Sequence, residues 1–410
     1  MGKTVLILGG GIQQRPLFEA ASRRGDTAYL VDYLESPACA GLAARHFQTS
    51  TFDVEGVEVV AKACGAEHIL TSGTDQPVYT AAAVSSRLGL VHPINESQGL
   101  WFTHKTYMKK RLLLGGIQTP RTTTCRRGSN PQVPFPPPYV VKPSDSQGQR
   151  GISLLTANQA EGGGLETAIE RALAHSRSGS AVVEQFVEGR EVTANCWVSG
   201  GRIQFLQVND RLHFDDQKVL GVCKEHRYPS KLVERPSEMA CLENAVSRIP
   251  EAFEIENGPL YAQFVMDRDG QPWLIELGYR VGGGFEAFFI PRMTGFDILG
   301  QYYDLVTDRG TSIESVQLNR HDFGSICFLF GKPGKVSHVD ATEEFLGSGG
   351  ITVSPGDRIE ELEDATSRIG HFLVLADDVE SYHKRLERLE AEVRATDDTG
   401  RDLIIRGIYE

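Results

Sequence analysis

Short apolar runs alternate with amphipathic stretches over the first hundred residues of the chain. The apolar runs are rich in β-forming residues, and two of the amphipathic stretches end at a glycine. Strands that alternate with helices in this way predict a doubly wound α/β layer, which we assign to residues 1–103. The predicted strands are 4–8, 29–32 and 68–71, and the predicted helices are 15–24, 57–64 and 80–88.

The pattern changes after residue 104. A basic helix over 104–114 leads to a proline-rich connector at 131–138, and the chain then becomes rich in strands. From about residue 322 it shows short strands, Pro-Gly turns and a charged helix over 381–392, whose charges indicate a solvated face. We therefore predict a central domain over 104–310 and a small α+β domain over 311–410. The central strands are predicted at 139–142, 181–186, 191–198 and 202–208, with helices at 165–174 and 238–253.

One segment of the central domain, residues 259–284, carries candidate metal chemistry. It reads as a strand, an Asp-Gly turn and a second strand, with Gln263 and Glu276 near the ends of the hairpin and Arg280 shortly after it. Two oxygen ligands held side by side suit a hard cation such as Mg²⁺. An arginine beside that cation suits a phosphate, so the segment predicts a Mg²⁺–nucleotide site.

A second segment suits the phosphates of the nucleotide. The strand at 139–142 ends in Lys142, and a loop of small polar residues follows, with glycines at 148 and 151. Such a loop leaves backbone N–H groups free to wrap phosphate oxygens, and Lys142 adds a positive charge. The P-loop motif is absent, and an ordinary flexible hairpin is the alternative interpretation.

A third segment suits the base and the ribose. An apolar strand ends in Glu184, and a second acid, Glu191, follows a short linker. The backbone groups of a strand edge can imitate base pairing with adenine, and a carboxylate just past the turn can accept both ribose hydroxyls. A charged β-turn is the alternative.

The first glycine cluster raises a different possibility. Gly9 and Gly11 follow a strand, and Asp32 ends the next one, as in half of a dinucleotide-binding fingerprint. The third glycine of that fingerprint would be residue 14, which is Gln14. A tight turn in an α/β layer explains the same residues, and NAD binding stays as the alternative.

The composition of the chain indicates where the protein acts and which partners it does not bind. The 410-residue chain has a formal net charge of −12, which argues against a nucleic-acid surface. Its seven cysteines form no Cys-x-x-Cys pair and are odd in number, which fits free thiols in a reducing cytoplasm. The apolar run at the start is too short for a signal peptide, and no stretch approaches a membrane span. We expect a cytoplasmic protein that binds neither nucleic acid nor membrane.

Taken in order, these segments resemble the ATP-grasp superfamily over roughly residues 1–310. The resemblance implies a Rossmann-like pre-ATP-grasp domain, a central ATP-grasp fold with a nucleotide lid at about 140–200, and catalytic roles for Lys142 and Arg280. Gly278 departs from the family pattern, because an asparagine usually supplies a third metal ligand there. His104 also stands where an aspartate is frequent. The implied nucleotide-binding residues are Lys105, Lys142, Ser146, Gly148, Gln149, Gly151, Glu184, Gln185, Phe186, Val187 and Glu191, and the implied metal ligands are Gln263 and Glu276.

The resemblance also implies an activity. Most members of the superfamily use ATP and Mg²⁺ to activate a carboxylate as an acyl phosphate, which an amine then attacks, releasing ADP and phosphate. We expect a carboxylate–amine ligase with one or two Mg²⁺ ions (Mn²⁺ as a substitute), small-molecule acid and amine substrates, and a homodimer as one open form of assembly. Glu286 is a candidate for holding an amine and Arg292 for holding a carboxylate, each with a surface or helix-capping charge as the alternative. A bicarbonate-using carboxylating enzyme, a dehydrogenase and a nucleotide-binding non-enzyme remain rivals.

Overall fold

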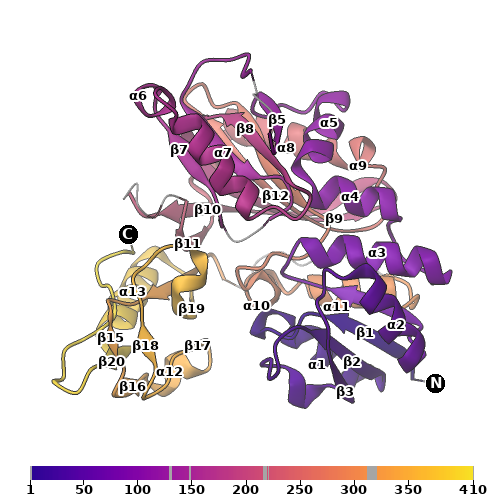
Figure 1. Cartoon of the computed structure of the whole chain (residues 1–410). Helices are drawn as coiled ribbons and strands as arrows, with labels where there is room; N and C mark the ends of the chain where they lie inside the picture. The colour runs from indigo at the N-terminus through magenta and orange to yellow at the C-terminus, as the bar shows by residue number, and fades with distance from the viewer. Residues whose placement is uncertain are drawn as a thin grey trace.

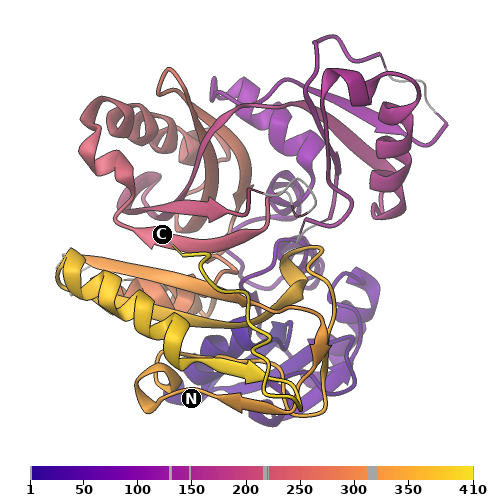
Figure 2. The same cartoon turned by 90° about the vertical axis from the view of Figure 1, so that its left-hand side faces the viewer.

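The computed structural model describes residues 2–128, 132–146, 149–215, 219, 221–311 and 321–409. Figure 1 shows an indigo N-terminal layer and a yellow C-terminal part beside each other, with the strand-rich central part above both. Figure 2 gives the view from the left-hand side, in which the C-terminal part lies in front of the N-terminal layer and still below the central part. The central part therefore contacts both of the others.

The N-terminal layer is a parallel sheet with strand order β3-β2-β1-β4, covered by helices. The apolar residues of β1 are fully buried, as expected for a strand covered on both faces. The predicted α/β fold is confirmed here. Helices α2 and α3 begin earlier than predicted, because Asp53 caps one and a proline occupies the first turn of the other. The elements are β1 (Thr4–Leu8), η1 (Ile12–Gln14), α1 (Arg15–Arg24), β2 (Thr27–Asp32), η2 (Ala40–Leu42), β3 (Arg45–Gln48), α2 (Val54–Cys64), β4 (His68–Thr71) and α3 (Gln76–Leu88).

A small antiparallel sheet of order β5-β8-β6-β7 follows, and we call it the lid. Helix α7 covers it, packing Ile169 and Leu173 against Val141 and Val183. Two further helices, α4 and α5, lead from the N-terminal layer to the lid. The elements are α4 (Glu96–Thr103), α5 (Lys105–Leu114), β5 (Thr122–Arg126), β6 (Tyr139–Pro143), β7 (Ser153–Leu155), α6 (Ala157–Ala160), α7 (Gly164–Ala174) and β8 (Ser180–Gln185).

The central sheet has eight strands in the order β13-β12-β9-β10-β11-β14-β19-β17. Three of them come from the segment predicted as a separate C-terminal domain, so a single sheet runs through both segments. Strand β11 has the sequence CKEHRY, which carries too many charges for its apolar pattern to reveal a strand. The elements are β9 (Gly189–Ser199), β10 (Arg202–His213), β11 (Cys223–Tyr228), η4 (Lys231–Glu234), α8 (Pro236–Ser247), α9 (Ile249–Ala252), β12 (Gly258–Asp267), β13 (Pro272–Gly278), α10 (Glu286–Thr294), α11 (Ile298–Val306) and β14 (Phe323–Phe330).

The C-terminal part adds two short strand pairs and an amphipathic helix to the end of this sheet. Helix α13 buries Tyr382, Leu386 and Leu389, so only its other face is solvated. No helix in the described ranges is long and apolar enough to cross a membrane. The elements are β15 (Gly334–Lys335), β16 (His338–Asp340), α12 (Glu343–Leu346), β17 (Gly349–Ile351), β18 (Arg358–Ile359), η5 (Ala365–Ser367), β19 (Arg368–Ala376), α13 (Val379–Glu392) and β20 (Arg394–Thr396).

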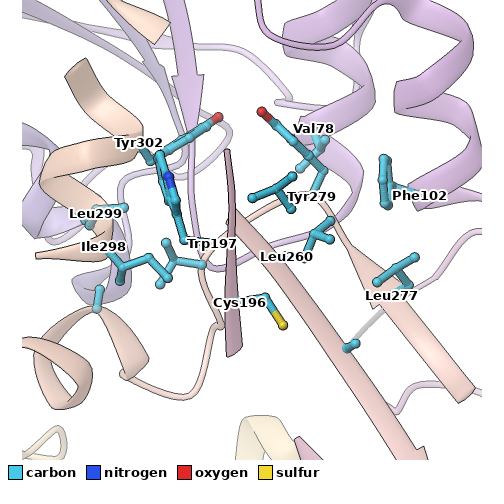
Figure 3. Packing of buried hydrophobic residues seen from close by; sticks show 14 of the residues in the cluster. Val78, Phe102, Cys196, Trp197, Leu260, Leu277, Tyr279, Ile298, Leu299 and Tyr302 are labelled. Carbon is cyan, nitrogen blue, oxygen red and sulfur yellow. The ribbon is translucent and has the colours of Figure 1, made fainter. Parts of the chain in front are cut away.

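One apolar core joins the N-terminal layer to the central sheet. Figure 3 shows Val78 of α3 and Phe102 of α4 near Leu277 and Tyr279 from the end of the β12–β13 hairpin. The rings of Phe102 and Tyr279 lie 5.7 Å apart, centroid to centroid. Aromatic contacts of this kind add to the burial of apolar surface, so the two layers are held in a defined relation at the hairpin.

Candidate active site

A pocket of about 640 Å³ opens between the lid and the central sheet. Its walls come from β6 and β8 of the lid, the linker after β8, the ends of β10 and β11, and the β12–β13 hairpin. Most residues that the sequence predicted for the nucleotide and the metal face it. The predicted residues among its lining are Lys142, Gln149, Glu184, Gln185, Phe186, Val187, Glu191, Gln263 and Glu276.

A buried cluster of two lysines and one glutamate forms one wall. Glu184 is 1% exposed, and its carboxylate lies 2.9 Å from Lys142 Nζ and 3.3 Å from Lys109 Nζ. Lys109 Nζ also donates a hydrogen bond to Thr119 Oγ1. Sequence reasoning missed Lys109, because it sits in a basic helix where a solvated lysine is the ordinary expectation.

The charges of this cluster are set by burial and by one another. Burial would raise the pKa of Glu184, but Lys109 and Lys142 hold it down to about 2. Burial lowers the pKa of Lys109 to about 8 despite the nearby glutamate. Burial also acts to lower the pKa of Lys142, but Glu184, and then Glu276 and Glu191, raise it above its ordinary value. Lys142 is therefore a fixed positive charge on the pocket wall.

The polar loop after β6 lies beside the first turn of α5. Lys105 Nζ donates to the carbonyl oxygen of Ser146 at 3.1 Å. Gln149 and Gly151 both have positive φ, and the Gln149 amide donates to the carbonyl of Gly221. Predicted residue Gly148 lies outside the described residues. The described parts of the loop bring Lys105 and Ser146 together, but Lys105, Ser146 and Gly151 are not among the residues that line the pocket.

The linker after β8 carries the predicted adenine and ribose positions. Gln185 and Phe186 both donate their backbone N–H groups within the lid. Glu191 lies at the start of β9, and its carboxylate is 3.4 Å from Arg211 Nε and 3.3 Å from His213 Nε2. Burial would raise the pKa of Glu191, but His213, Arg211 and Lys142 lower it. Neither Arg211 nor His213 was a sequence candidate, because strand β10 was predicted to end before them.

Gln263 and Glu276 are directly paired across the β12–β13 hairpin. The register shifts beside them, which leaves Ile275 as an extra residue and gives a β-bulge at the pocket wall. The Gln263 amide nitrogen donates to Tyr261 Oη at 3.2 Å, which leaves its oxygen free to accept. Within the described ranges, no group of three or more His, Cys, Asp or Glu residues is arranged to hold a metal.

Arg280 is buried and forms a two-point ion pair with Asp75 of the N-terminal layer. Its Nε lies 2.5 Å from Asp75 Oδ1, and its Nη2 lies 3.0 Å from Oδ2. The guanidinium also lies over the ring of Tyr261, 4.7 Å from its centroid. Gly278 faces this pair, because a Cβ there would lie 2.8 Å from Asp75 Oδ1. Asp75 was not a sequence candidate, since nothing in its local pattern shows that it meets a residue so distant in the chain.

The two predicted substrate residues have different surroundings. Glu286 is buried at the start of α10, with its carboxylate 3.1 Å from His226 Nδ1. His226 in turn contacts Arg211, whose Nη1 lies 3.0 Å from His226 Nε2. Arg292 lies on the exposed side of α10 and donates to the carbonyl of Phe288. The structure brings Glu286 toward the pocket residue Arg211, whereas Arg292 does not line the pocket.

The glycine cluster after β1 has a structural explanation. Asp32 is buried, and its carboxylate accepts hydrogen bonds from the backbone N–H groups of Gly10 and Leu34. The carboxylate is thus used to fix the turn in which Gly10 lies. This supports the tight-turn interpretation over the dinucleotide one.

Comparison with known proteins agrees with this geometry. A model described as "ATP-grasp domain" matches residues 135–287, and one described as "L-amino acid ligase C-terminal domain 2" matches residues 327–396. Residues 135–287 are therefore an ATP-grasp domain, and residues 327–396 resemble the C-terminal domain of L-amino acid ligases.

Individual relatives are more distant. The D-alanine–D-alanine ligase of Parabacteroides distasonis is 27% identical over 179 residues, which cover 42% of this chain and 51% of that protein. The chain thus spans about half the length of this curated relative. The crystal structure of an L-amino acid ligase from Bacillus licheniformis superposes with a TM-score of 0.78 at 17% identity, covering 96% of this chain and 98% of that one. The biotin carboxylase domain of a 2-oxoglutarate carboxylase from Hydrogenobacter thermophilus superposes with a TM-score of 0.75 at 17% identity, covering 97% and 91%.

Proposed function

We propose that the chain is an ATP-dependent carboxylate–amine ligase that joins two small molecules, at least one of them an amino acid. The observation that carries the proposal is the pocket in which Lys142, Glu191, Gln263 and Glu276 face one another. The C-terminal match to L-amino acid ligases supports an amino-acid substrate. The proposal extends to a cytoplasmic location, for which the free cysteines are the support.

The proposed reaction has two steps, phosphoryl transfer and amide formation. A carboxylate oxygen of the acid attacks the γ-phosphorus of ATP, and ADP leaves. The neutral amine nitrogen then attacks the carbonyl carbon of the acyl phosphate, phosphate leaves carrying one of the original carboxylate oxygens, and the proton that the nitrogen loses passes to the phosphate. Lys142 and Arg280 are the cations of this chain that we assign to the negative charge on the transferring group. The lid excludes water, which would otherwise hydrolyse the acyl phosphate.

The donor set of the hairpin fits Mg²⁺, the hard cation that the family uses. Gln263 presents an amide oxygen and Glu276 a carboxylate, and both are oxygen ligands of the type that Mg²⁺ prefers. When bound, the ion neutralises charge on the phosphates. Only one of the two side chains is anionic, so we infer that phosphate oxygens and water complete the coordination, with one ion or two.

We assign the nucleotide to the part of the pocket away from the β12–β13 hairpin. We assign the adenine to the linker Glu184–Val187 and the ribose to Glu191, whose carboxylate is held by two cationic or polar side chains of β10. Lys105, Ser146, Gln149 and Gly151 are assigned to the phosphates with Lys142. Gly148 keeps the same assignment from the sequence alone.

The test is a screen of pairs of the common L-amino acids for ATP-dependent release of ADP, with mass spectrometry of the products. We expect at least one pair to give ADP and a dipeptide in equal amounts. ADP release that depends on bicarbonate and on a single substrate would instead favour a carboxylating enzyme, which the similarity to the biotin carboxylase domain keeps as the second candidate. ATP binding without turnover under any pair would contradict both.

A further inference from the structure

A β-bulge in the C-terminal part turns one arginine toward strand β11. Strands β14 and β19 pair Leu329 with Gly370 and Phe330 with Arg368, so Ile369 is the extra residue. Ile369 packs into the apolar core of the C-terminal part. Arg368 consequently lies on the other face of the sheet, where its guanidinium covers the ring of Phe328 at 3.6 Å. Bulges next to active sites commonly redirect a side chain in this way.

On that face Arg368 meets the elements that surround Glu286. Its Nη2 donates to the carbonyl oxygen of Cys223 on β11 at 3.4 Å. Cys223 shares an apolar cluster with Phe285, the residue before Glu286, and with Phe328. Burial lowers the pKa of Arg368, and the charges of Cys223, Arg211 and Glu286 also act on it.

Arg368 differs from the neighbouring cations in having no carboxylate partner within ion-pair distance among the described residues. Its Nε is buried and has no hydrogen-bond partner there. The buried Cys223 thiol, whose pKa His226 and Arg211 lower to about 6 against the effect of burial, is shared among these cations, so the desolvated guanidinium of Arg368 still favours an anionic ligand. The neighbouring pairs, by contrast, are Arg280 with Asp75 at 2.5 Å, Arg211 with Glu191 at 3.4 Å and His226 with Glu286 at 3.1 Å.

We propose that Arg368 binds the carboxylate of the amino acid that supplies the amine, while Glu286 faces its amino group. The inference rests on the proposed ligase function. The acid that becomes phosphorylated loses its carboxylate charge during the reaction, and we assign it to Lys142 and Arg280. The attacking amino acid keeps its carboxylate throughout, so it needs a permanent cation away from the phosphates. A cation and an anion on facing elements match the two charges of an amino acid.

The experiment compares each active amine substrate with its carboxamide, which lacks the charge. The probes are the common L-amino acids that release ADP as the second substrate and their amides, for example L-alanine and L-alaninamide. In the wild-type protein we expect the carboxamide to show a KM about 10- to 100-fold higher, the usual effect of losing one charge-assisted hydrogen bond. Equal KM values for the two would overturn the proposal without any variant.

The variant Arg368→Met keeps the length of the stem over Phe328 and removes the charge. We expect it to raise the KM of the amino acid to that of the carboxamide, so that the preference disappears, with the KM for ATP changed less than about twofold. Arg388→Met, on the exposed side of α13, is the matched control and should keep the preference. If Arg368→Met does not fold, Arg368→Lys should retain part of the preference.

Other outcomes separate the possible errors. A preference that persists in Arg368→Met would show that another group holds the carboxylate. A selective rise in the KM for ATP would assign Arg368 to a phosphate and overturn the proposal. Wild-type protein that releases no ADP with any pair would contradict the ligase function itself, whereas ADP release without discrimination against carboxamides would contradict the role of Arg368 alone.

Discussion

At the scale of single residues, the pocket depends on charges that are paired before any ligand arrives. Glu184 forms ion pairs with Lys142 and Lys109, and Arg211 forms one with Glu191. Paired, desolvated charges keep a fixed geometry, because breaking one pair leaves the other group buried without a partner. The sequence predicted Lys142 and Glu184 because each stands at the end of an apolar run, and Glu191 because it follows the short linker after Glu184. It missed Lys109 and Arg211, since a lone basic residue in a helix or strand carries no local sign of its partner.

Replacing Lys142 with methionine keeps the bulk of the side chain and removes its charge. We expect turnover to fall by about 10²-fold or more, as when a preorganised donor to the transition state is lost. The KM for the amine should change little, because we assign Lys142 to the phosphates of ATP. Steady-state ADP release measures both, and circular dichroism checks the fold. Turnover close to that of the wild type in a folded variant would remove Lys142 from the reaction.

The low pKa of Glu184 has a consequence for stability in acid. Its pKa is about 2 in the folded protein against an ordinary value of 4.5, so the unfolded chain binds more protons between these values. The stabilisation from the ionised carboxylate is present above pH 4.5 and is lost as the pH falls toward 2. The loss is about 3 kcal/mol.

Glu184→Gln tests this linkage. The variant should be less stable than the wild type at pH 6, and the difference in free energy of unfolding should shrink as the pH falls below 4.5. Urea unfolding at pH values from 6 to 3 measures it. A difference that stays constant over this range would mean that Glu184 is not held ionised in the folded protein.

At the scale of elements, the β12–β13 hairpin shows what a sequence can reveal. Both strands and the turn follow from the apolar runs on either side of Asp-Gly. The direct pairing of Gln263 with Glu276 does not, because it depends on the bulge at Ile275, and without that bulge Gln263 would pair with Ile275. Strand β11 was not predicted, because its charged residues hide the alternation typical of a strand. The buried face of α13 was not predicted either, because Glu, Arg and Lys residues surround its three buried side chains in the sequence.

The hairpin also corrects an expectation about Gly278. From sequence, an asparagine there would add a metal ligand and tighten Mg²⁺ or leave it unchanged. In the structure the position faces the Asp75–Arg280 ion pair, and a Cβ would approach Asp75 Oδ1 to 2.8 Å. We therefore expect Gly278→Asn to lower turnover, and Glu276→Gln to abolish it by removing the anionic metal ligand. The rate of ADP release, measured against Mg²⁺ concentration in the wild type, Gly278→Asn and Glu276→Gln, tests both expectations. Full activity in Glu276→Gln would mean that the hairpin is not the metal site.

At the scale of the whole molecule, the N-terminal layer reaches into the site through Asp75. The residue lies just before α3, and its carboxylate fixes the guanidinium of Arg280 after β13. The shared core in Figure 3 holds the two layers together around this contact. The sequence predicted the N-terminal fold correctly, but it could not place this layer against the hairpin, because contacts between distant segments leave no local pattern. The eight-stranded sheet that joins the central and C-terminal segments was missed for the same reason.

Asp75→Asn tests this arrangement. The amide keeps the shape but weakens the two-point contact, so Arg280 should lose its fixed orientation, and turnover should fall by about 10-fold or more with a small change in the KM for ATP. The matched control is Asp304→Asn, which breaks an ion pair of α11 with Arg24 of α1, away from the pocket. Equal effects of the two variants on turnover would mean that Asp75 acts only through stability.

The central claim is that the pocket activates a carboxylate by transferring phosphate to it. The most direct measurement uses the acid substrate with both carboxyl oxygens labelled as ¹⁸O, followed by mass spectrometry of the phosphate released with ADP and amide. The account predicts one ¹⁸O atom in each phosphate, because the carboxylate oxygen that attacks the γ-phosphorus leaves with it. Product formation with no label in the phosphate would contradict the acyl phosphate and the assignment of the pocket to it.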